Sequence, residues 1–274
     1  MIRLFARLVT LSALSVFCGV APGLATRAQD APLSASQIRE FLLTAKVVKH
    51  KGLGKGVTHP TRLTLTNGTL THDAVFSSVD ETVPIMRYAS GRTELDFVDS
   101  YRYNIAAYRL AELLGLDGMM PVTVERAWDG RKGSLTWWID AMMDEEQRWK
   151  QKMQPPDSEA WSRQMHRMRV FSQLVADTDR NLGNALIDRD WKLWMIDFTR
   201  AFRRARTPLA PGDLQRCDRQ LLARLRELTA QAVQARTAPF IAGKEIEPLM
   251  ARRDAIVTIF DKLIAERGED RVLY

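Results

Sequence analysis

The chain has 274 residues, of which 46% are hydrophobic and 27% charged, so it has enough apolar material for one large core or two small ones. It contains no repeat and no low-complexity tail, which is typical of a globular protein. A formal charge of +7 favours anionic partners such as nucleotide phosphates, acidic proteins or anionic lipid heads, but no basic run is long enough to favour nucleic acid.

The first residues have the pattern of a secretory signal. Two arginines precede an apolar run at 8–20, and small residues follow, so we expect cleavage after Ala25 or Ala28. Residues 1–28 are therefore predicted as a signal peptide, and the protein as exported to the periplasm or the extracellular space, with no stable membrane span after cleavage. Cys217 is then the only cysteine, so the mature chain must fold without an intrachain disulfide.

Residues 29–140 are predicted as a strand-rich region that follows a short helix. Ser34 and Gln37 form a capping-box pair at the start of that helix. From Ala45 onward the apolar residues alternate as in strands, and Asn67-Gly68 is a strong hairpin turn between two such runs.

Three glycines, Gly52, Gly54 and Gly56, lie in the first turn of this region. Glycine lets backbone N–H groups approach phosphate oxygens closely, and this G-x-G-x-G turn resembles the glycine-rich lid of the kinase-like families, which implies that these residues bind a cofactor phosphate. Any flexible loop also carries glycines, so this pattern is weak without its context.

A helix and a second hairpin complete the strand-rich region. The apolar spacing predicts a helix over 101–114, with Asp99 or Ser100 as its N-cap and Gly115 at its end. Asp129-Gly130 is the turn of the second hairpin. The paired tryptophans at 137–138 that follow are expected to pack in the core or at its rim.

Residues 141–274 are predicted to be mainly helical. A helix beginning at Asp157 or Ser158 has an apolar stripe that continues to Val175, and further helical patterns follow it. The strand-rich and helical halves together predict an α+β protein with two lobes and a cleft between them. Cys217 is expected to pack in the helical half rather than to react.

The stretch 177–198 has the strongest functional signal. Its two apolar runs flank a polar turn and predict a hairpin, with Asn184 just before the first strand and Asp197 just after the second. An antiparallel hairpin brings those ends together, and Asp179 lies in the loop that precedes it. Oxygen ligands from one or two side chains plus phosphates are what magnesium prefers, so a magnesium site is predicted here, although Asp and Asn also form ordinary turns.

The motifs D-R-N-x-x-N and I-D-F of this stretch resemble those of the protein-kinase-like superfamily, in particular its phosphatidylinositol 3- and 4-kinase-like, HipA-like and Golgi casein kinase-like branches. The resemblance implies a bacterial protein with a two-lobed kinase-like fold that uses ATP and magnesium. It assigns proton acceptance from a hydroxyl to Asp179, and metal binding to Asn184 and Asp197. Asn181 stands where many of these families have His, and Thr199 replaces the Gly of D-F-G.

Two further residues of the kinase pattern are missing. The strand over 74–79 has no Lys for the α and β phosphates, and Asn104 occupies the position expected for the Glu that would pair with it. Glu94 with Arg87 or Arg62 could replace that pair.

The predicted function is therefore ATP- and magnesium-dependent phosphoryl transfer to a hydroxyl of a protein, lipid or small molecule. One alternative is a kinase-like binding module without catalysis, which the missing Lys and Glu favour. Another is an enzyme that transfers AMP with ATP reversed in the same cleft. Export favours the binding module because ATP is scarce outside the cytoplasm, whereas the three retained polar residues favour an enzyme.

Overall fold

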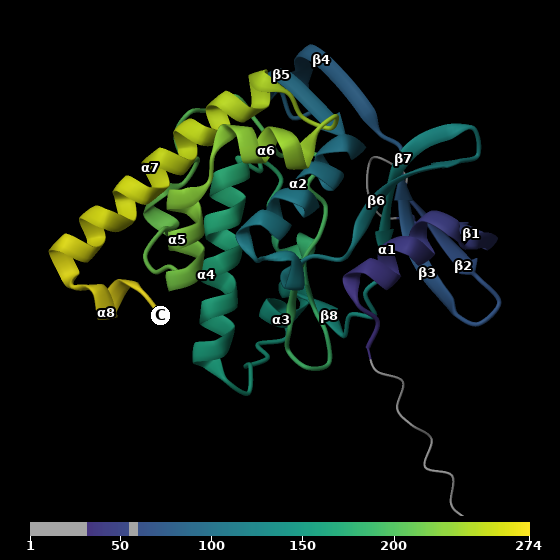
Figure 1. The fold of residues 1–274 in the computed structure, drawn as a ribbon, viewed down its shortest axis with the longest axis horizontal. Helices are drawn as coiled ribbons and strands as arrows, with labels where there is room; N and C mark the ends of the chain where they lie inside the picture. The colour runs from purple at the N-terminus through teal and green to yellow at the C-terminus, as the bar shows by residue number, and fades with distance from the viewer. Residues whose placement is uncertain (1–31, 55–59) are drawn as a thin grey trace, which may run out of the picture. The chain divides into compact units, whose positions relative to one another are not determined.

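The structure, a computed structural model, describes residues 32–54 and 60–274, which combine a strand-rich part with a helical part (Figure 1). The predicted α+β class is confirmed. The predicted signal peptide and Gly56 lie outside the described residues. None of the helices in the described part is long and apolar enough to cross a membrane.

The larger sheet has five antiparallel strands in the order β1-β2-β3-β7-β6. The strands are β1 Lys46–Gly52, β2 Thr61–Thr66, β3 Thr71–Ser77, β6 Thr123–Trp128 and β7 Arg131–Trp137. Both predicted turns are confirmed. Asn67 Oδ1 accepts the N–H groups of Thr69 and Leu70 at 3.2 and 2.9 Å, which fixes the first turn, and Gly68 adopts the left-handed φ of 94°.

One face of this sheet is covered by helix α1, Ala35–Thr44, which packs against β6 and β7. The expected capping box of Ser34 and Gln37 is present. The Arg126 guanidinium on β6 donates to the carbonyl oxygens of Leu42 and Ala45, both at 2.6 Å. The carbonyls at the end of the helix are therefore satisfied by a side chain from the sheet.

A two-stranded ribbon between β3 and the next helix was not predicted from the sequence. It consists of β4 Asp80–Arg87 and β5 Thr93–Ser100, paired antiparallel. Nearly all of its side chains are at least partly exposed, and Phe97 and Ser100 are the buried ones. A ribbon without a buried face has no apolar alternation, and Pro84 interrupts its β pattern, so the sequence offers little signal.

Helix α2, Tyr101–Leu114, follows the ribbon and agrees with the prediction. Ser100 is the N-cap, because its Oγ accepts the Arg102 N–H at 3.3 Å. Gly115 ends the helix at φ 67°, and a Cβ placed there would collide with the Arg224 side chain. Most of the helix is buried between the sheet and the helical part.

The helical part has the elements α3 Glu145–Lys150, α4 Ser158–Val175, α5 Arg219–Glu227, α6 Ala230–Thr237, α7 Gly243–Arg267 and α8 Glu269–Val272. Asp157 is the N-cap of α4, as expected. Cys217 is buried and pairs with Leu273 in an isolated bridge. Burial raises the pKa of its thiol to about 12, so the thiol stays protonated and packs rather than reacts.

Candidate functional site

The predicted hairpin at 177–198 is confirmed. Strands β9 Ala185–Ile187 and β10 Leu193–Met195 pair antiparallel, and the short β8, Met143–Asp144, pairs with β9. Beyond the last paired residues, the Ile196 N–H donates to Asn184 O at 3.1 Å. The segment before β9 therefore lies directly beside the one after β10, which is where Asp197 follows.

A single guanidinium, that of Arg180, holds these two segments together. It forms an ion pair of 2.6 Å with Asp177, whose side chain is fully buried. It also donates to the carbonyl oxygens of Asn184 and Ile196, both at 2.8 Å, and of Asp197 at 3.1 Å. Its planar face lies 4.2 Å from the ring centroid of Phe198. Sequence reasoning missed this role, because the motif shows an arginine but not its four hydrogen-bond partners.

Asp179 is exposed at the mouth of the loop, and its neighbours fix its backbone. The amide nitrogens of Asn184 and Asn181 donate to Asp179 O at 3.0 and 3.2 Å, and Asn181 also approaches Asp179 Oδ1 at 3.4 Å. The backbone N–H of Asp179 donates to Asp177 Oδ1 at 3.0 Å. Because the Asn184 nitrogen is used in this way, its amide oxygen is the atom left for a cation.

Asp197 adopts a left-handed backbone conformation with φ 57°, which Asp tolerates better than most residues. Water reaches its carboxylate, yet protein atoms surround the group closely, and this desolvation raises its pKa above the ordinary value. The Thr199 hydroxyl, which donates to Oδ1 at 3.1 Å, and the Arg180 charge oppose the rise, while Asp99 and Asp179 add to it.

Asp99, at the end of β5, is a third acidic group of this region that sequence reasoning did not place in the site. Its Oδ1 is buried without a hydrogen-bond partner. Burial raises its pKa; a hydrogen bond with Thr199 and the charge of Arg200 oppose the rise, and the charges of Asp179 and Glu81 add to it. The negative field around Asp197 is therefore only partly compensated by protein cations.

The donor set fits a magnesium ion that also takes phosphate ligands. In the described part of the chain no group of three or more His, Cys, Asp or Glu side chains is arranged as a metal site. Magnesium usually takes one or two carboxylates plus phosphates and water rather than a closed protein cage. One carboxylate, Asp197, and one amide oxygen, Asn184, in a negative field that protein cations compensate only in part, match that preference.

A cavity of about 450 Å³ opens beside Asp197, between the five-stranded sheet and the hairpin. Leu53, Val75 and Met120 give apolar contacts from the sheet side, and Leu186 and Met195 from the hairpin side. Its charged lining residues in the described part are Asp140 and Asp197. The size and largely apolar walls are those of a small-molecule or cofactor site.

The two adjacent tryptophans line this cavity, and each has a polar side chain stacked on it. His72 lies parallel to Trp137 with ring centroids 3.5 Å apart, and the Arg62 guanidinium lies 3.9 Å from the Trp138 ring. Burial lowers the pKa of His72, so this ring is neutral at pH 7. The connection between the sheet and the helical part is therefore held in a defined geometry.

Asn104, which stands where a Glu was expected, and Ser77, at the end of the strand that has no Lys, both line the cavity. The Asn104 side chain accepts the Phe198 N–H at 2.6 Å and donates to Ser134 Oγ at 3.4 Å. Asn104 thus joins α2 to the residue after Asp197 by neutral hydrogen bonds, with no ion pair at this position.

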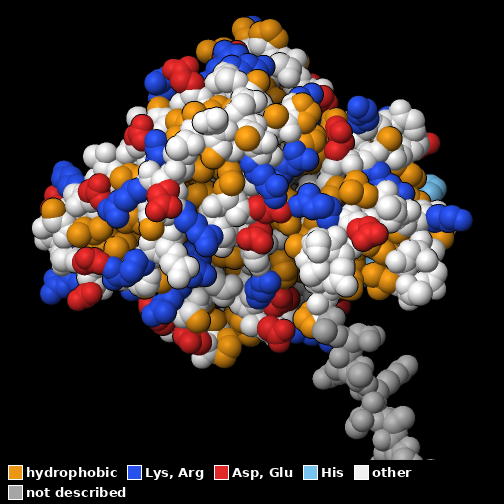
Figure 2. Space-filling view, viewed as in Figure 1, with side chains coloured by type: hydrophobic (Ala, Val, Ile, Leu, Met, Phe, Trp, Pro, Cys, Tyr) orange, Lys and Arg blue, Asp and Glu red, His pale blue; other side chains and the backbone are white. Residues whose placement is uncertain are grey.

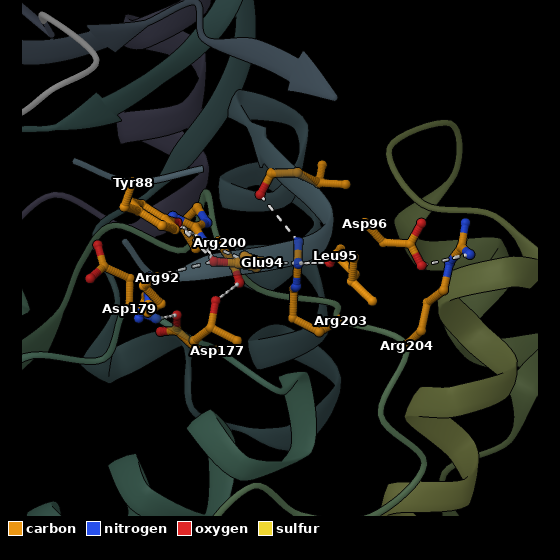
Figure 3. Close-up of polar contacts among 12 residues, drawn as sticks. Tyr88, Arg92, Glu94, Leu95, Asp96, Asp177, Asp179, Arg200, Arg203 and Arg204 are labelled. Atoms are coloured by element: carbon orange, nitrogen blue, oxygen red, sulfur yellow. Dashed lines mark hydrogen bonds and ion pairs between the residues drawn. The ribbon is translucent and has the colours of Figure 1, made fainter. Parts of the chain in front are cut away.

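The suggested replacement pair of Glu94 with Arg87 or Arg62 is wrong. Glu94 pairs instead with Arg200 and Arg203, each at 2.7 Å, and the Tyr88 hydroxyl donates to it at 2.8 Å (Figure 3). Arg62 donates to Asp73 at 2.6 Å on the sheet. The reason is the unpredicted ribbon, which carries Glu94 toward the segment after Asp197 rather than into the cavity.

Two of the three predicted glycines are described. Gly54 lines the cavity together with Leu53, whereas Gly52 does not. A Cβ added at either position would meet no atom within 4 Å, so packing does not require glycine there. Gly56 lies outside the described residues.

Comparisons with solved structures identify the fold. The chain superposes on hydra Fam20, solved with a sugar, with a TM-score of 0.63 over 89% of this chain and 93% of that one, at 13% identity. A Golgi casein kinase matches with a TM-score of 0.61 over 87% and 79% of the two chains, also at 13% identity. The Helicobacter pylori proinflammatory kinase CtkA matches with a TM-score of 0.53 over 81% and 98%, at 10% identity.

No protein-family model matches the chain, and no curated protein gives a significant match. At such low identity the structural likeness shows the fold alone. The chain has a protein-kinase-like fold, and its cavity lies between the strand-rich part and the hairpin that carries Asp197.

Proposed function

We propose that the protein is an ATP- and magnesium-dependent phosphotransferase that acts on a hydroxyl of a protein, lipid or small molecule. The observation that carries the proposal is the position of Asp197 on an apolar cavity, with Asn184 held beside the same hairpin edge. The kinase-like fold of the solved neighbours supports it. Export from the cytoplasm, and a place near the phosphatidylinositol kinase-like, HipA-like or Golgi casein kinase-like branches, are parts of the same proposal.

In this proposal each polar residue has one task. Asp197 and Asn184 would hold magnesium, which supplies charge neutralisation at the transferring phosphate. Asp179, exposed and fixed by Asn181 and Asn184, would accept the proton of the acceptor hydroxyl. Asn104 would keep Phe198, and with it Asp197, in place.

Nucleotide binding is expected to depend strictly on magnesium, because the two charged residues in the described cavity lining are both acidic. ATP with magnesium should raise the melting temperature, and a ligand at about 100 times its Kd stabilises by about 2.7 kcal/mol. Neither ATP in chelator nor magnesium alone should give that shift. An equal shift from ATP in chelator, or none at millimolar ATP with magnesium, would contradict the proposal.

Asp179→Asn is expected to lower transfer about 10²- to 10⁴-fold while the magnesium–ATP shift stays nearly unchanged, because the residue would act on the acceptor and not on the metal. The measurement is phosphate incorporation into a model acceptor, or into the protein itself, by mass spectrometry. Asp190→Asn, an exposed aspartate in the turn of the same hairpin, is the matched control and should keep full activity. Loss of the thermal shift in Asp179→Asn would mean that the residue is structural.

Gly54→Ala is expected to weaken ATP binding about tenfold without a loss of stability. The position has open space around it, and its role would be to let the backbone approach phosphate oxygens. Titration calorimetry with magnesium–ATP measures the effect. Gly212→Ala, at a glycine with equally open surroundings, controls for the change in backbone freedom. Unchanged affinity in Gly54→Ala would remove this turn from the proposed site.

A kinase-like binding module without catalysis is the second candidate, and one observation favours it. Asn104 replaces the expected Glu and the strand that ends at Ser77 has no Lys, so no cation in the described lining orients the α and β phosphates. The mass measurement separates the candidates. Addition of phosphate supports the first, addition of AMP supports the reversed-nucleotide enzyme, and a shift without any covalent product supports the module.

A further inference from the structure

A second cavity, of about 360 Å³, shares no lining residue with the first. It lies where the β4–β5 ribbon, the start of α2, the loop around Phe202 and the start of α7 come together, and Figure 1 shows β5 and the beginning of α7 next to each other. The proposed phosphoryl transfer uses none of its residues. Its composition indicates a ligand of another kind.

The inner wall of this second cavity is apolar. Tyr103 and Phe202 are buried, and their ring centroids are 5.3 Å apart. Val98 and Leu95 continue the wall along β5, and Leu95 is 69% exposed, the largest value with Trp149 among the exposed large hydrophobic residues of the described chain. An exposed leucine that lines a cavity offers apolar surface to a ligand at no cost in desolvated polar groups.

The rim of the same cavity carries exposed positive charge. Arg204 and Lys244 have side chains that are 65% and 70% exposed, and their ion pairs, with Asp96 at 3.1 Å and Glu245 at 3.6 Å, are of the weak surface type. Figure 2 shows basic and apolar side chains side by side at the top of the view, in the region of the ribbon. Exposed, loosely paired cations can turn toward an incoming anion.

The acidic residues of the lining are already engaged. Asp96 pairs with Arg204, and buried Glu245 accepts the Tyr103 hydroxyl at 3.4 Å and the Ala242 N–H at 3.0 Å. Arg203 also lines the cavity, but its guanidinium is paired with Glu94 at 2.7 Å. Both carboxylates of the described lining are therefore engaged, and the exposed cations Arg204 and Lys244 are the charged groups that an anionic ligand can reach.

A buried charge behind the wall adds to this positive field. The Arg252 guanidinium is completely buried and donates to the carbonyl oxygens of Arg203, at 2.8 Å, and Ala205, which both line the cavity. Its Nη2 has no hydrogen-bond partner, and burial lowers its pKa only to about 10, so the group stays charged at pH 7. The first turn of the 25-residue helix α7 lies at this cavity, because Lys244 and Glu245 both belong to the lining.

We propose that this second cavity binds a carboxylate attached to a short apolar group, either a free aliphatic acid or the apolar C-terminal residue of a peptide. The apolar group contacts Leu95, Tyr103 and Phe202, and the carboxylate lies at the rim with Arg204 and Lys244. The site is independent of the proposed nucleotide site, so each can fail without the other.

Titration calorimetry of the chain without its predicted signal peptide, with octanoate, octanol and octylamine as probes, tests the proposal. Octanoate should bind at least about tenfold more tightly than octanol, because the neutral probe has the same apolar chain but no charge for the rim. Octylamine should not bind. Equal binding of octanoate and octanol, or no binding of octanoate, would overturn the proposal.

Variants test whether octanoate binds at the second cavity. Lys244→Gln should weaken octanoate binding about threefold to tenfold, whereas Lys262→Gln, an equally exposed lysine on the same helix, should leave it unchanged. Leu95→Ser should also weaken binding, and because Leu95 is 69% exposed the substitution removes no core packing. Equal effects of Lys244→Gln and Lys262→Gln would mean that octanoate binds elsewhere.

A second set of titrations, with peptides, distinguishes the two sources of the carboxylate. A short peptide that ends in leucine with a free carboxylate is compared with its C-terminal amide and with octanoate. Tighter binding of the free-acid peptide identifies a peptide terminus as the ligand, and tighter binding of octanoate identifies an aliphatic acid. Equal binding of the acid and amide peptides together with failure of octanoate would refute both.

Discussion

Arg180→Met is expected to destabilise the protein by about 3–5 kcal/mol, the usual cost of removing one partner of a buried ion pair. Asp177, whose side chain is fully buried, would lose the partner of its 2.6 Å ion pair. The carbonyl oxygens of Asn184, Ile196 and Asp197 would lose their shared donor at the same time. Urea unfolding followed by circular dichroism gives the free energy of unfolding.

Two comparisons show whether this result is specific to the Arg180 guanidinium. Arg189→Met, at an exposed arginine in the turn of the same hairpin, should change stability by less than about 0.5 kcal/mol. Arg180→Met with Asp177→Asn should recover part of the loss, because the uncompensated carboxylate is removed. If Arg180→Met were as stable as Arg189→Met, the Arg180 guanidinium would not hold the two segments together.

The hairpin at 177–198 shows what local sequence determines. Its turn is built from Asp188, whose Oδ1 accepts the N–H groups of Asp190 and Lys192 at 3.0 Å, so the chain reverses where the polar residues stand. Once the turn is fixed, antiparallel pairing places Asn184 beside the segment that carries Asp197. The predicted juxtaposition needed no long-range information. The metal and proton roles of these residues stay predictions.

The contacts that escaped prediction are those between distant segments. Glu94 is more than one hundred positions from Arg200 and Arg203, and no local pattern in the exposed β4–β5 ribbon pairs them. The sequence shows that Asn104 stands where a Glu was expected. It does not show that Asn104 accepts a hydrogen bond from the Phe198 N–H, because that contact depends on how α2 packs in the fold. Periodicity reveals which face of an element is buried, but it does not reveal which polar group meets which across the core.

Asp197→Asn is expected to abolish the magnesium–ATP shift and, in the absence of ligand, to stabilise the protein at pH 7. Asparagine keeps the shape and tolerates the left-handed φ of 57°, so the backbone is not strained. The substitution removes a carboxylate whose charge is disfavoured by desolvation and by the negative charges of Asp99 and Asp179. Water in the cavity screens part of that charge, so the gain is modest, about 1 kcal/mol or about 2–4 °C in melting temperature.

The pH dependence of this difference follows from the sign of the shift. The pKa of Asp197 is raised in the folded state above its ordinary value of 3.8, so the folded protein keeps this proton at a pH where the unfolded chain has lost it. Wild-type stability therefore falls as the pH rises from the ordinary pKa through the raised one, and Asp197→Asn lacks this contribution. Melting curves of both proteins from pH 3 to 8 should coincide at the acid end and separate, with the variant higher, toward neutrality.

The charge of Asp197 links the stability of the protein to the proposed activity. A carboxylate that destabilises the protein without a cation gains the most when a cation binds, so magnesium with ATP should stabilise the wild type and not the variant. Asp190→Asn, in the exposed turn, should show neither the gain in stability nor the loss of the shift. A variant that is less stable than the wild type at pH 7 would mean that Asp197 is a structural residue and that its charge is satisfied within the fold.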